Sequence, residues 1–441
     1  MSKNNIPTLW TTMPVDHFDP LNNATFRMRY MINEEFFGGP GSPVFIFVGG
    51  EWDIGEGWLL VGNMYEQARE NRGYMIYTEH RYYGETLPFP IFTTENLRFL
   101  NVDQALADLA LFVEDLRKQP RFADSKIVLT GCSYAANMVV WFQQRYPHLV
   151  RGVVASSGPI KGKVDYYEYL QVVHEAFLSE GGEQCIAHMR QGILDTVRAM
   201  GSEEGRRELE RNFRLCDGID YDDHLLMGYF SGMVTWAFSG ATQNARPGNI
   251  IDICDRFDTD QFGTTPMEKL AGYIAWRNNW PACVTLSMDA FMSNYMVPRS
   301  NSRAWYYQTC TEYGYFQISS RVGTVFDPLY WLDVEFYVEV CKRAFNIDFD
   351  KKFVFDAVDR VNLMFGGLSP VVNNTINIHG HNDPWRALGV YDRDLTDTSP
   401  TFNVARASHC FDIQSWQATD TIAMTNTQQR IRRIVRSWLN N

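Results

Sequence analysis

The chain has 441 residues, of which 45% are hydrophobic and 14% aromatic, enough to bury the core of one large domain with an insertion or of two smaller domains. Its formal net charge of -12 argues against a nucleic-acid partner, because neutralising phosphates requires a basic face. No run of 18 or more apolar residues occurs, so the sequence predicts no membrane-spanning helix.

Cysteines and sequons indicate the compartment. The first residues lack the apolar core of a secretory leader, which taken alone favours a cytosolic protein or a trimmed chain. Eight dispersed cysteines without C-x-x-C spacing favour disulfides over a zinc site, and two sequons predict glycosylation at Asn23 and Asn373. We therefore expect a secreted or lysosomal protein, with reduced thiols in a cytosolic protein as the alternative.

An α/β pattern runs through the first part of the chain. Residues 26–32 alternate apolar and polar side chains, as in an edge or outer strand. Further along, short apolar runs typical of buried parallel strands alternate with segments of helical periodicity. The apolar runs cover residues 43–48, 74–78, 126–130 and 150–156, and residues 101–118 have helical spacing. Strands separated by helices predict a mainly parallel sheet.

The pattern changes near residue 164. Amphipathic helical segments follow and carry six of the eight cysteines, and strand patterns resume at residues 375–379 and 402–405. A last amphipathic helix is expected at residues 425–439. The sequence thus predicts an α/β core formed by residues 1–163 and 351–441, with a mainly helical unit inserted at residues 164–350.

Residues 126–145 carry the strongest catalytic signal. The strand predicted at 126–130 and the helix predicted from Tyr134 onward flank the sequence Gly131-Cys132-Ser133-Tyr134-Ala135. A G-x-S-x-[GA] sequence at a strand-to-helix turn is typical of a nucleophile elbow, which exposes the serine hydroxyl above the sheet. We therefore expect Ser133 to be a nucleophile.

Two loops should supply the oxyanion hole that such a nucleophile needs. The backbone N–H of Tyr134 points at the same spot from the start of the helix. A second donor is expected from the glycine-rich loop after residues 43–48, either the N–H of Gly50 or that of Glu51.

The acid and the base are expected on loops after late strands, in the chain order Ser, Asp, His. Asp383 follows the strand predicted at 375–379, and His409 follows the strand predicted at 402–405. His409 would take the proton of Ser133, and Asp383 would orient the imidazole. His379 and His381 are rival bases, but the first lies within a strand pattern and the second precedes the acid.

With these motifs assembled, the chain resembles the family of prolyl carboxypeptidase, dipeptidyl peptidase II and thymus-specific serine protease, with the thymus-specific branch nearest. The resemblance rests on Glu79-His-Arg-Tyr-Tyr-Gly-Glu, Gly-Cys-Ser133-Tyr, Asp383-Pro-Trp, Ser-His409-x-x-Asp and residues 307–317. It implies an α/β-hydrolase fold with a helical cap, peptide hydrolysis often beside proline, and a Ser133, Asp383, His409 triad. Two departures are Cys132 and Ala135, where the family usually has glycine, and Cys410 beside the base.

The resemblance also suggests a disulfide framework. The family pattern pairs Cys185 with Cys254, Cys216 with Cys283 and Cys310 with Cys341. Cys132 and Cys410 are left as a fourth pair, and they flank the candidate nucleophile and the candidate base. A bridge there would either brace the site or stiffen it to the point of lost activity.

Specificity stays open at this point. Glu51, Asp53 or Glu312 could anchor an ammonium group of a peptide. An apolar slot for a proline ring is expected from aromatic residues of the cap and from Trp385. These cap residues are Trp305, Tyr306, Tyr313, Tyr315 and Phe316. The leading interpretation is a serine exopeptidase, either a carboxypeptidase or a dipeptidyl peptidase, that uses no cofactor or metal and is a monomer or a homodimer. An esterase or lipase with the same triad, and a catalytically silent binding relative, are the alternatives.

Overall fold

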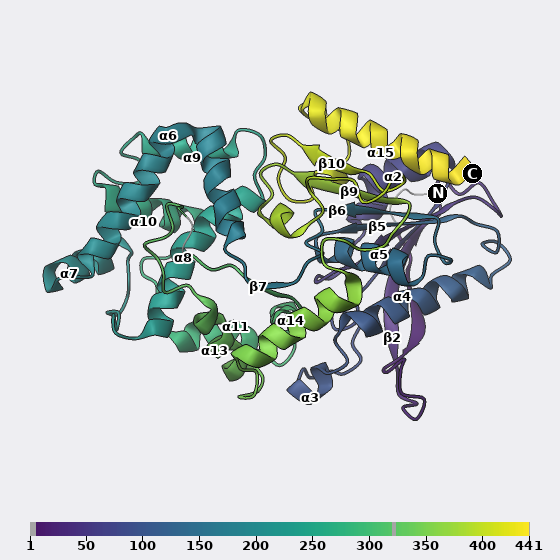
Figure 1. The fold of residues 1–441 in the computed structure, drawn as a ribbon, viewed down its shortest axis with the longest axis horizontal. Coiled ribbons are helices and arrows are strands. Elements are labelled where there is room, and N and C mark those ends of the chain that lie inside the picture. Colours follow the sequence, from purple (N-terminus) through teal and green to yellow (C-terminus); the bar gives the residue numbers. More distant parts are fainter. Residues whose placement is uncertain (1–5, 320–322, 441) are drawn as a thin grey trace.

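The structure is a computed structural model that describes residues 6–319 and 323–440. Within these residues, eight strands form one twisted sheet in the order β1-β2-β4-β3-β5-β6-β9-β10 (Figure 1). β1 pairs antiparallel with β2, and β2 antiparallel with β4, whereas the remaining neighbours in this sheet run parallel. The strands are β1 (Thr8–Pro14), β2 (Thr25–Asn33), β3 (Val44–Val48), β4 (Tyr74–Thr78), β5 (Ile127–Cys132), β6 (Gly152–Ser156), β9 (Thr375–Gly380) and β10 (Thr401–Val404).

Helices cover both faces of this sheet. The central strands β3, β4 and β6 are buried along their whole length, which explains why their sequences are continuous apolar runs instead of alternating ones. α4 (Val102–Arg117) and α5 (Tyr134–Arg145) pack on one face, while α2 (Asn63–Asn71) and α15 (Ile422–Asn440) pack on the other (Figure 1). The sheet therefore lies between two hydrophobic cores.

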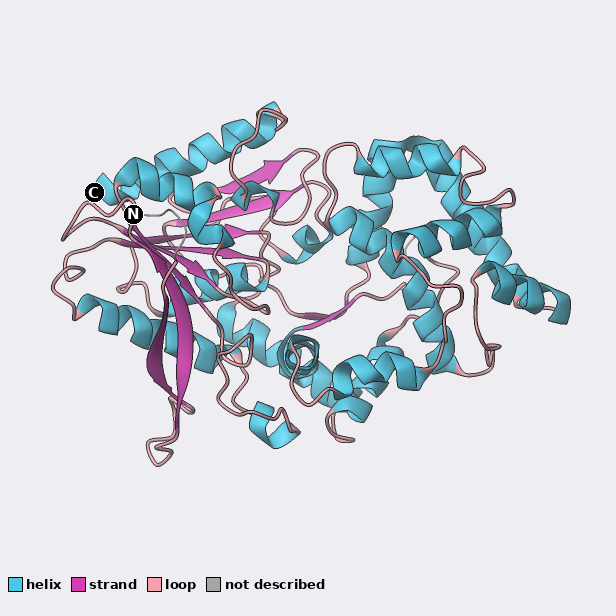
Figure 2. Cartoon of the chain, turned by 180° about the vertical axis from the view of Figure 1, so that it is seen from behind, coloured by secondary structure: helices cyan, strands magenta, loops and turns pink. Residues whose placement is uncertain are grey.

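A second, helical part of the molecule lies at one end of the sheet (Figures 1 and 2). It is formed mainly by the helices that follow β6 in the chain, and three disulfides, Cys185–Cys254, Cys216–Cys283 and Cys310–Cys341, lie within it. Its helices are α6 (Glu168–Ala199), α7 (Glu203–Asn212), α8 (His224–Gln243), α9 (Asn249–Phe257), α10 (Pro266–Arg277), α11 (Met288–Met296), α12 (Asn301–Gln308), the π-helix η1 (Thr309–Tyr313) and α13 (Val334–Ala344).

Two short strands connect the parts. β7 (Lys163–Asp165) pairs in parallel with β8 (Gly314–Phe316), away from the main sheet. In Figure 2 this ribbon lies between the sheet and the helical part. α14 (Lys351–Phe365) then leads the chain back toward β9, and it contacts η1 and β7. The remaining short helices are α1 (Gly57–Leu60), α3 (Thr94–Leu97), and the 3-10 turns η2 (Pro384–Leu388) and η3 (Phe411–Ile413).

This strand order and the helices on both faces are those of an α/β-hydrolase fold, as expected from the sequence. One detail differs, because the strand expected at the edge, β2, is covered by β1, which the sequence pattern did not reveal. Met13 is the one buried residue of β1, and the strand ends at Pro14, so its apolar pattern is weak. The bounds of the inserted unit, residues 164 and 350, stay a prediction.

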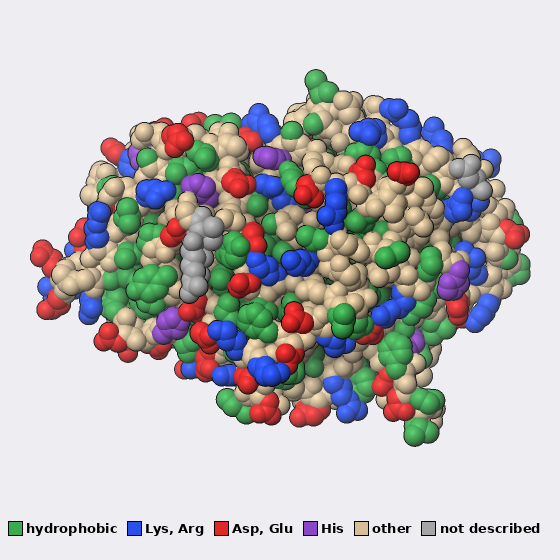
Figure 3. Space-filling model, in the orientation of Figure 1, with side chains coloured by type: hydrophobic (Ala, Val, Ile, Leu, Met, Phe, Trp, Pro, Cys, Tyr) green, Lys and Arg blue, Asp and Glu red, His purple; other side chains and the backbone are tan. Residues whose placement is uncertain are grey.

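The surface carries charges of both signs. On the face drawn in Figure 3, Lys and Arg side chains are interspersed with Asp and Glu over both parts of the molecule. None of the helices in residues 6–319 and 323–440 is long and apolar enough to cross a bilayer.

Candidate active site

Ser133 lies at the turn between β5 and α5 in a backbone conformation that few residues adopt. Its φ of 59° and ψ of -129° lie outside the ordinary regions for an L-residue. Close packing enforces the turn, because a Cβ on Gly131 would lie 2.2 Å from the backbone oxygen of Ala135. Ala135 is fully buried, so a small side chain at the last position of the motif suffices. The turn has the geometry of a nucleophile elbow.

Asp383 and His409 are brought together from two loops at the carboxyl ends of β9 and β10. The Asp383 side chain is 0% exposed, and His409 Nδ1 lies 2.9 Å from Oδ1 and 3.0 Å from Oδ2 of this carboxylate. Burial alone would raise the pKa of Asp383, but the charge and hydrogen bond of His409 outweigh it and hold the pKa below its usual range. An ionised carboxylate therefore faces the imidazole.

The rival histidines lie in surroundings that differ from those of His409. His379 is buried in β9, and burial lowers its pKa to about 4. The exposed His381 shares a hydrogen bond with the hydroxyl of Tyr391, at 3.0 Å from its Nδ1. Neither forms a hydrogen bond with the Asp383 carboxylate in the described structure, whereas His409 does.

A disulfide joins the nucleophile loop to the base loop. Cys132 precedes Ser133 and Cys410 follows His409, and the two cysteines are bonded with a Cα–Cα distance of 5.9 Å. The backbone N–H of Cys410 also donates to Ser157 Oγ at 2.9 Å, just beyond β6. Ser133 and His409 are thus held as neighbours, although the hydrogen bond between their side chains is not formed in this structure, as is common before a substrate binds.

All eight cysteines lie in the described part of the chain and are paired. The bonds are Cys185–Cys254, Cys216–Cys283 and Cys310–Cys341, the three pairs implied by the resemblance, and Cys132–Cys410, the expected fourth pair.

The expected oxyanion donors lie on the two loops that were predicted to carry them. Gly50 and Glu51 follow β3, the sheet neighbour of β5, and Tyr134 is the first residue of α5. The backbone N–H groups of Gly50 and Tyr134 donate to no acceptor among the described residues. The N–H of Glu51 faces its own carboxylate. Gly50 and Tyr134 therefore have donors available for a developing oxyanion.

Glu51 places a carboxylate in the site. Its Oε2 is buried and has no hydrogen-bond partner in the described part of the chain. Burial raises its pKa to about 7, and both its own N–H and the nearby positive charge of His409 oppose this rise. A buried acceptor without a partner is unusual and marks a position where a substrate group can bind.

The carboxylate of Glu312 is bonded within the protein, which argues against the expectation that it could anchor a substrate. The residue is 1% exposed, and its carboxylate accepts hydrogen bonds from the Val102 N–H at 2.9 Å and from Gln308 Nε2 at 3.2 Å. Asp53, in contrast, is exposed and accepts a hydrogen bond from Asn301 of α12 at 2.8 Å. It lines a cavity of about 350 Å³ that also borders Trp52 and Cys132.

Aromatic side chains of the helical part surround a cavity of about 280 Å³. Trp385 forms one wall, and its ring centroid is 6.3 Å from that of His409. Trp305, Tyr306, Tyr315 and Phe316 line the cavity as expected. Tyr313 does not, because it is fully buried behind Tyr315 and stacks on it. This aromatic cavity therefore lies next to His409.

Behind the elbow lies a buried polar network that the sequence patterns did not reveal. Nδ1 of His80 is 2.7 Å from the Arg81 carbonyl, so it carries the proton, and Nε2 accepts from the Tyr134 hydroxyl at 3.0 Å. Gln308 Nε2 donates to the same hydroxyl at 3.1 Å, and the Tyr83 hydroxyl donates to Gln308 Oε1 at 2.6 Å. Burial lowers the pKa of His80 to about 4, which keeps this histidine neutral.

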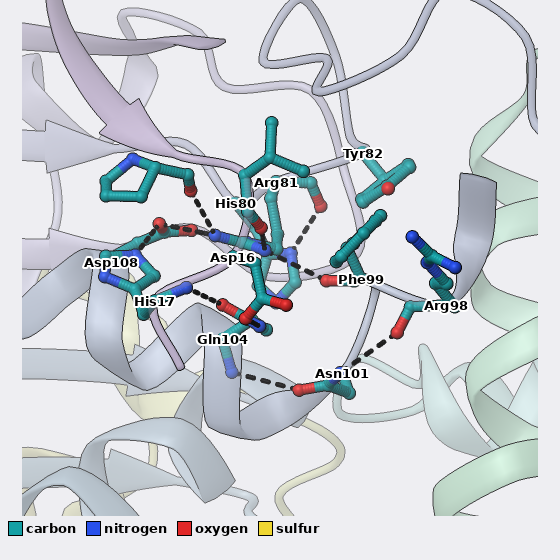
Figure 4. Close-up of polar contacts among 12 residues, drawn as sticks. Asp16, His17, His80, Arg81, Tyr82, Arg98, Phe99, Asn101, Gln104 and Asp108 are labelled. Atoms are coloured by element: carbon teal, nitrogen blue, oxygen red, sulfur yellow. Dashed lines mark hydrogen bonds and ion pairs between the residues drawn. The ribbon is translucent and has the colours of Figure 1, made fainter. Parts of the chain in front are cut away.

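The other residues of the Glu79-His-Arg-Tyr-Tyr-Gly motif hold the same loop. Glu79 accepts two hydrogen bonds from the guanidinium of Arg29, and Gly84 has a φ of 56° where a Cβ would lie 2.0 Å from Glu79 Oε1. Arg81 donates two hydrogen bonds to Asp108, at 2.6 and 2.7 Å (Figure 4). These bonds of the motif hold the loop in position.

Two further polar residues belong to the surroundings of the base. Asp412, the last residue of the Ser-His409-x-x-Asp motif, is buried and accepts a hydrogen bond from the Ser156 hydroxyl. Burial raises its pKa to about 6. Gln243 of α8 accepts two hydrogen bonds. The His409 N–H donates to its backbone oxygen at 3.2 Å, and Trp385 Nε1 donates to its side-chain oxygen at 2.9 Å. The helical part thus contributes to holding the base loop.

The two sequons lie at the surface. The Asn23 and Asn373 side chains are both exposed, as attachment of a glycan requires.

Comparison with known proteins gives the family. A profile of the serine carboxypeptidase S28 family matches residues 13–431. The thymus-specific serine protease of Mus musculus is 29% identical over 450 residues, which cover 98% of this chain and 87% of that protein. The lysosomal Pro-X carboxypeptidase of Mus musculus is 26% identical over 452 residues, which cover 98% and 89%. A solved structure, proline iminopeptidase from Mycobacterium smegmatis, matches 98% of each chain with 11% identity and a TM-score of 0.37. Because the family profile extends over almost the entire sequence, this chain belongs to the serine carboxypeptidase S28 family of serine peptidases.

Proposed function

We propose that the protein is a serine exopeptidase that cleaves short peptides beside proline or small residues, with Ser133, His409 and Asp383 as its triad. The hydrogen bond between the buried Asp383 carboxylate and His409 carries this proposal, since it leaves Nε2 of the imidazole free to accept a proton. The disulfide between the residues next to Ser133 and His409 supports it.

The chemistry proceeds in two steps. Ser133 Oγ attacks the scissile carbonyl carbon while His409 Nε2 takes its proton, and the C–N bond then breaks as the imidazolium protonates the leaving amine. Water next attacks the acyl ester and gives a proton to His409, and the ester C–O bond breaks to regenerate Ser133. Asp383 stays ionised throughout, consistent with its lowered pKa, and stabilises the imidazolium.

Charge develops on the carbonyl oxygen in both steps. The N–H of Tyr134 and the N–H of Gly50 or Glu51 stabilise it. The Gly50 donor has no competing acceptor among the described residues, whereas the N–H of Glu51 faces its own carboxylate, which favours Gly50.

Substrate selection depends on the cavities around the triad. The aromatic cavity beside Trp385 and Tyr315 suits a proline ring or another compact apolar side chain, because such rings pack well on aromatic faces. Glu51 and Asp53 are candidates for holding an ammonium group on the other side.

The protein is proposed to act in the lysosome or outside the cell. Pairing of all eight cysteines supports an oxidising compartment, and one relative is named a lysosomal carboxypeptidase. Exposed sequons at Asn23 and Asn373 support passage through the secretory route.

A fluorophosphonate probe and a peptide mixture test the function. The probe should label the wild-type protein and not Ser133→Ala, and the same substitution should abolish shortening of proline-containing peptides read by mass spectrometry. Hydrolysis of acyl esters with no action on peptides would instead identify an esterase. Absence of both labelling and hydrolysis would identify a silent relative of the fold.

A further inference from the structure

A second cavity borders the candidate base on the side of the helical part. Its volume is about 520 Å³, which is within the usual range for ligand pockets. Two segments form it, the loop that follows α8 and the base loop with the residues after it. The lining residues are Asn244, Arg246, Pro247, Ser408, His409, Phe411, Gln414, Ser415, Gln417, Thr419 and Asp420.

Arg246 is the permanent cation among these lining residues. Its guanidinium is exposed, and it forms neither an ion pair nor a side-chain hydrogen bond with any described residue. Asp420, the carboxylate in the same cavity, accepts the Gln417 N–H at 2.8 Å, so it is engaged in its own turn. Arg246 is therefore available to an anionic ligand.

The backbone of Arg246 is held at a fixed position relative to the base. The neighbouring Ala245 carbonyl accepts the Ser408 hydroxyl at 2.7 Å, and the Gln243 carbonyl accepts the His409 N–H at 3.2 Å. The Arg246 N–H itself donates to Asn249 Oδ1 at 2.8 Å. These bonds link the loop that carries Arg246 to the loop that carries His409, so both side chains line the same cavity.

If the proposed function holds, the leaving segment of a peptide departs beside the imidazole of His409, which this cavity borders. His409 protonates the leaving amine, so the residue that departs is adjacent to the imidazole. When that residue is the last one of the substrate, it carries an α-carboxylate, and this carboxylate loses its hydration shell when it enters the cavity. A planar guanidinium can replace this water with two parallel hydrogen bonds.

We propose that Arg246 binds the C-terminal carboxylate of the leaving segment and thereby makes the protein act at the carboxyl end of peptides. This inference rests on the proposed function. The acidic groups of the site, Glu51 and Asp53, lie on the loop after β3 and not in this cavity. The charges around the triad therefore favour a peptide whose ammonium group lies toward the β3 loop and whose carboxylate lies toward Arg246.

Paired peptides test the role of Arg246. The probe is one proline-containing peptide made with a free C-terminal carboxylate and with a C-terminal amide. The wild-type protein should cleave the free acid with the higher kcat/KM, and Arg246→Gln should lower kcat/KM for the acid by about 10- to 100-fold, mainly through KM. Cleavage of the amide should be unchanged, and Arg246→Lys should lie between the two.

Arg433→Gln is the matched control. Arg433 is exposed on α15 and has no ion-pair partner within residues 6–319 and 323–440, so its replacement should leave both peptides unaffected. Equal fluorophosphonate labelling of all variants shows that Ser133 and His409 remain intact. An acid preference that survives in Arg246→Gln, or wild-type cleavage of acid and amide at equal rates, would overturn the role of Arg246 while leaving the peptidase assignment in place. No cleavage of either peptide by the wild type would contradict the peptidase assignment and the role of Arg246 together.

Discussion

The nucleophile loop and the base loop are held by different kinds of interaction. Ser133 is positioned by its own neighbourhood in the chain, because β5, the tight turn at Gly131 and the start of α5 determine its backbone. His409 lies on a loop outside regular structure, and it is held by residues that are distant in sequence. These are Asp383, Gln243 and, through the disulfide of Cys410, Cys132.

This difference indicates where the site is robust. A local turn forms whenever its strand and helix form, so the nucleophile depends on few contacts. The base depends on several long-range contacts at once, and the loss of one can displace it. We therefore expect substitutions of the hydrogen-bond partners of His409 to lower activity at little cost to the fold, and substitutions around the elbow to act first on stability.

Asp383→Asn should show the largest effect. The amide has the same shape but cannot orient the imidazole as an acceptor of the Ser133 proton, so kcat should fall by about 10⁴-fold. Peptide hydrolysis at neutral pH measures this loss, and the thermal midpoint checks the fold. Asp260→Asn is the control, since this exposed carboxylate lies in the helical part. Activity within tenfold of the wild type would remove Asp383 from the triad.

Replacing Cys132 and Cys410 together by alanine separates the two loops. The bridge closes a loop of 278 residues, and its loss should lower the free energy of unfolding by about 2–5 kcal/mol. Because His409 is then less firmly placed, kcat should fall as well. Denaturant titration and kinetics at a temperature where the variant is folded measure both effects.

The control for this variant is Cys216→Ser with Cys283→Ser, which removes a bridge within the helical part. It should lower stability and leave kcat unchanged in the folded protein. If both double variants changed kcat equally, the Cys132–Cys410 bridge would have no special role in the site.

Glu312→Gln addresses the support behind the nucleophile. Burial raises the pKa of Glu312 to about 7, from an ordinary 4.5 that applies in the unfolded chain. Between pH 4.5 and pH 7 the folded state binds the proton of Glu312 and the unfolded state does not. The contribution of this proton to the free energy of unfolding is therefore fully present below about pH 4.5 and is lost as the pH rises toward 7. The loss at pH 7 is at most about 3 kcal/mol.

The glutamine variant should therefore be more stable than the wild type at pH 7 and similar at pH 4.5, while it keeps the acceptor for the Val102 N–H. Thermal midpoints across this pH range measure the difference. Parallel pH curves for the two proteins would show that Glu312 does not bind a proton on folding. Glu51 and Asp412 add to the same trend in the wild type, because burial raises the pKa of both, to about 7 and about 6.

Much of the fold and the triad could be predicted because their signals are local or ordered along the chain. β3 and β4 are unbroken apolar runs, and the elbow is a short motif with a strand before it and a helix after it. Asp383 and His409 could be predicted from chain order and from their position after late strands. Each of these signals depends on at most a few neighbouring residues.

Long-range pairing could not be predicted in the same way. Nothing near Glu312 in the sequence shows that its carboxylate meets the N-terminus of α4, 210 residues away. The partners of His80 and Tyr83 are likewise set by the fold, as is the meeting of Arg246 with His409 in one cavity. The contacts of Glu312, Tyr83 and Arg246 depend on the docking of the helical part, and no periodic pattern encodes that docking.

The sheet order has one more consequence. β6 and β9 are hydrogen-bonded neighbours, with Ser156 paired to Ile378, so the chain leaves the sheet for the helical part and returns to it at adjacent strands. Evolution can therefore lengthen, shorten or reshape everything between them without moving the strand ends that carry nucleophile and acid. In such an architecture, the range of peptides admitted can diverge quickly between relatives while the reaction itself stays the same.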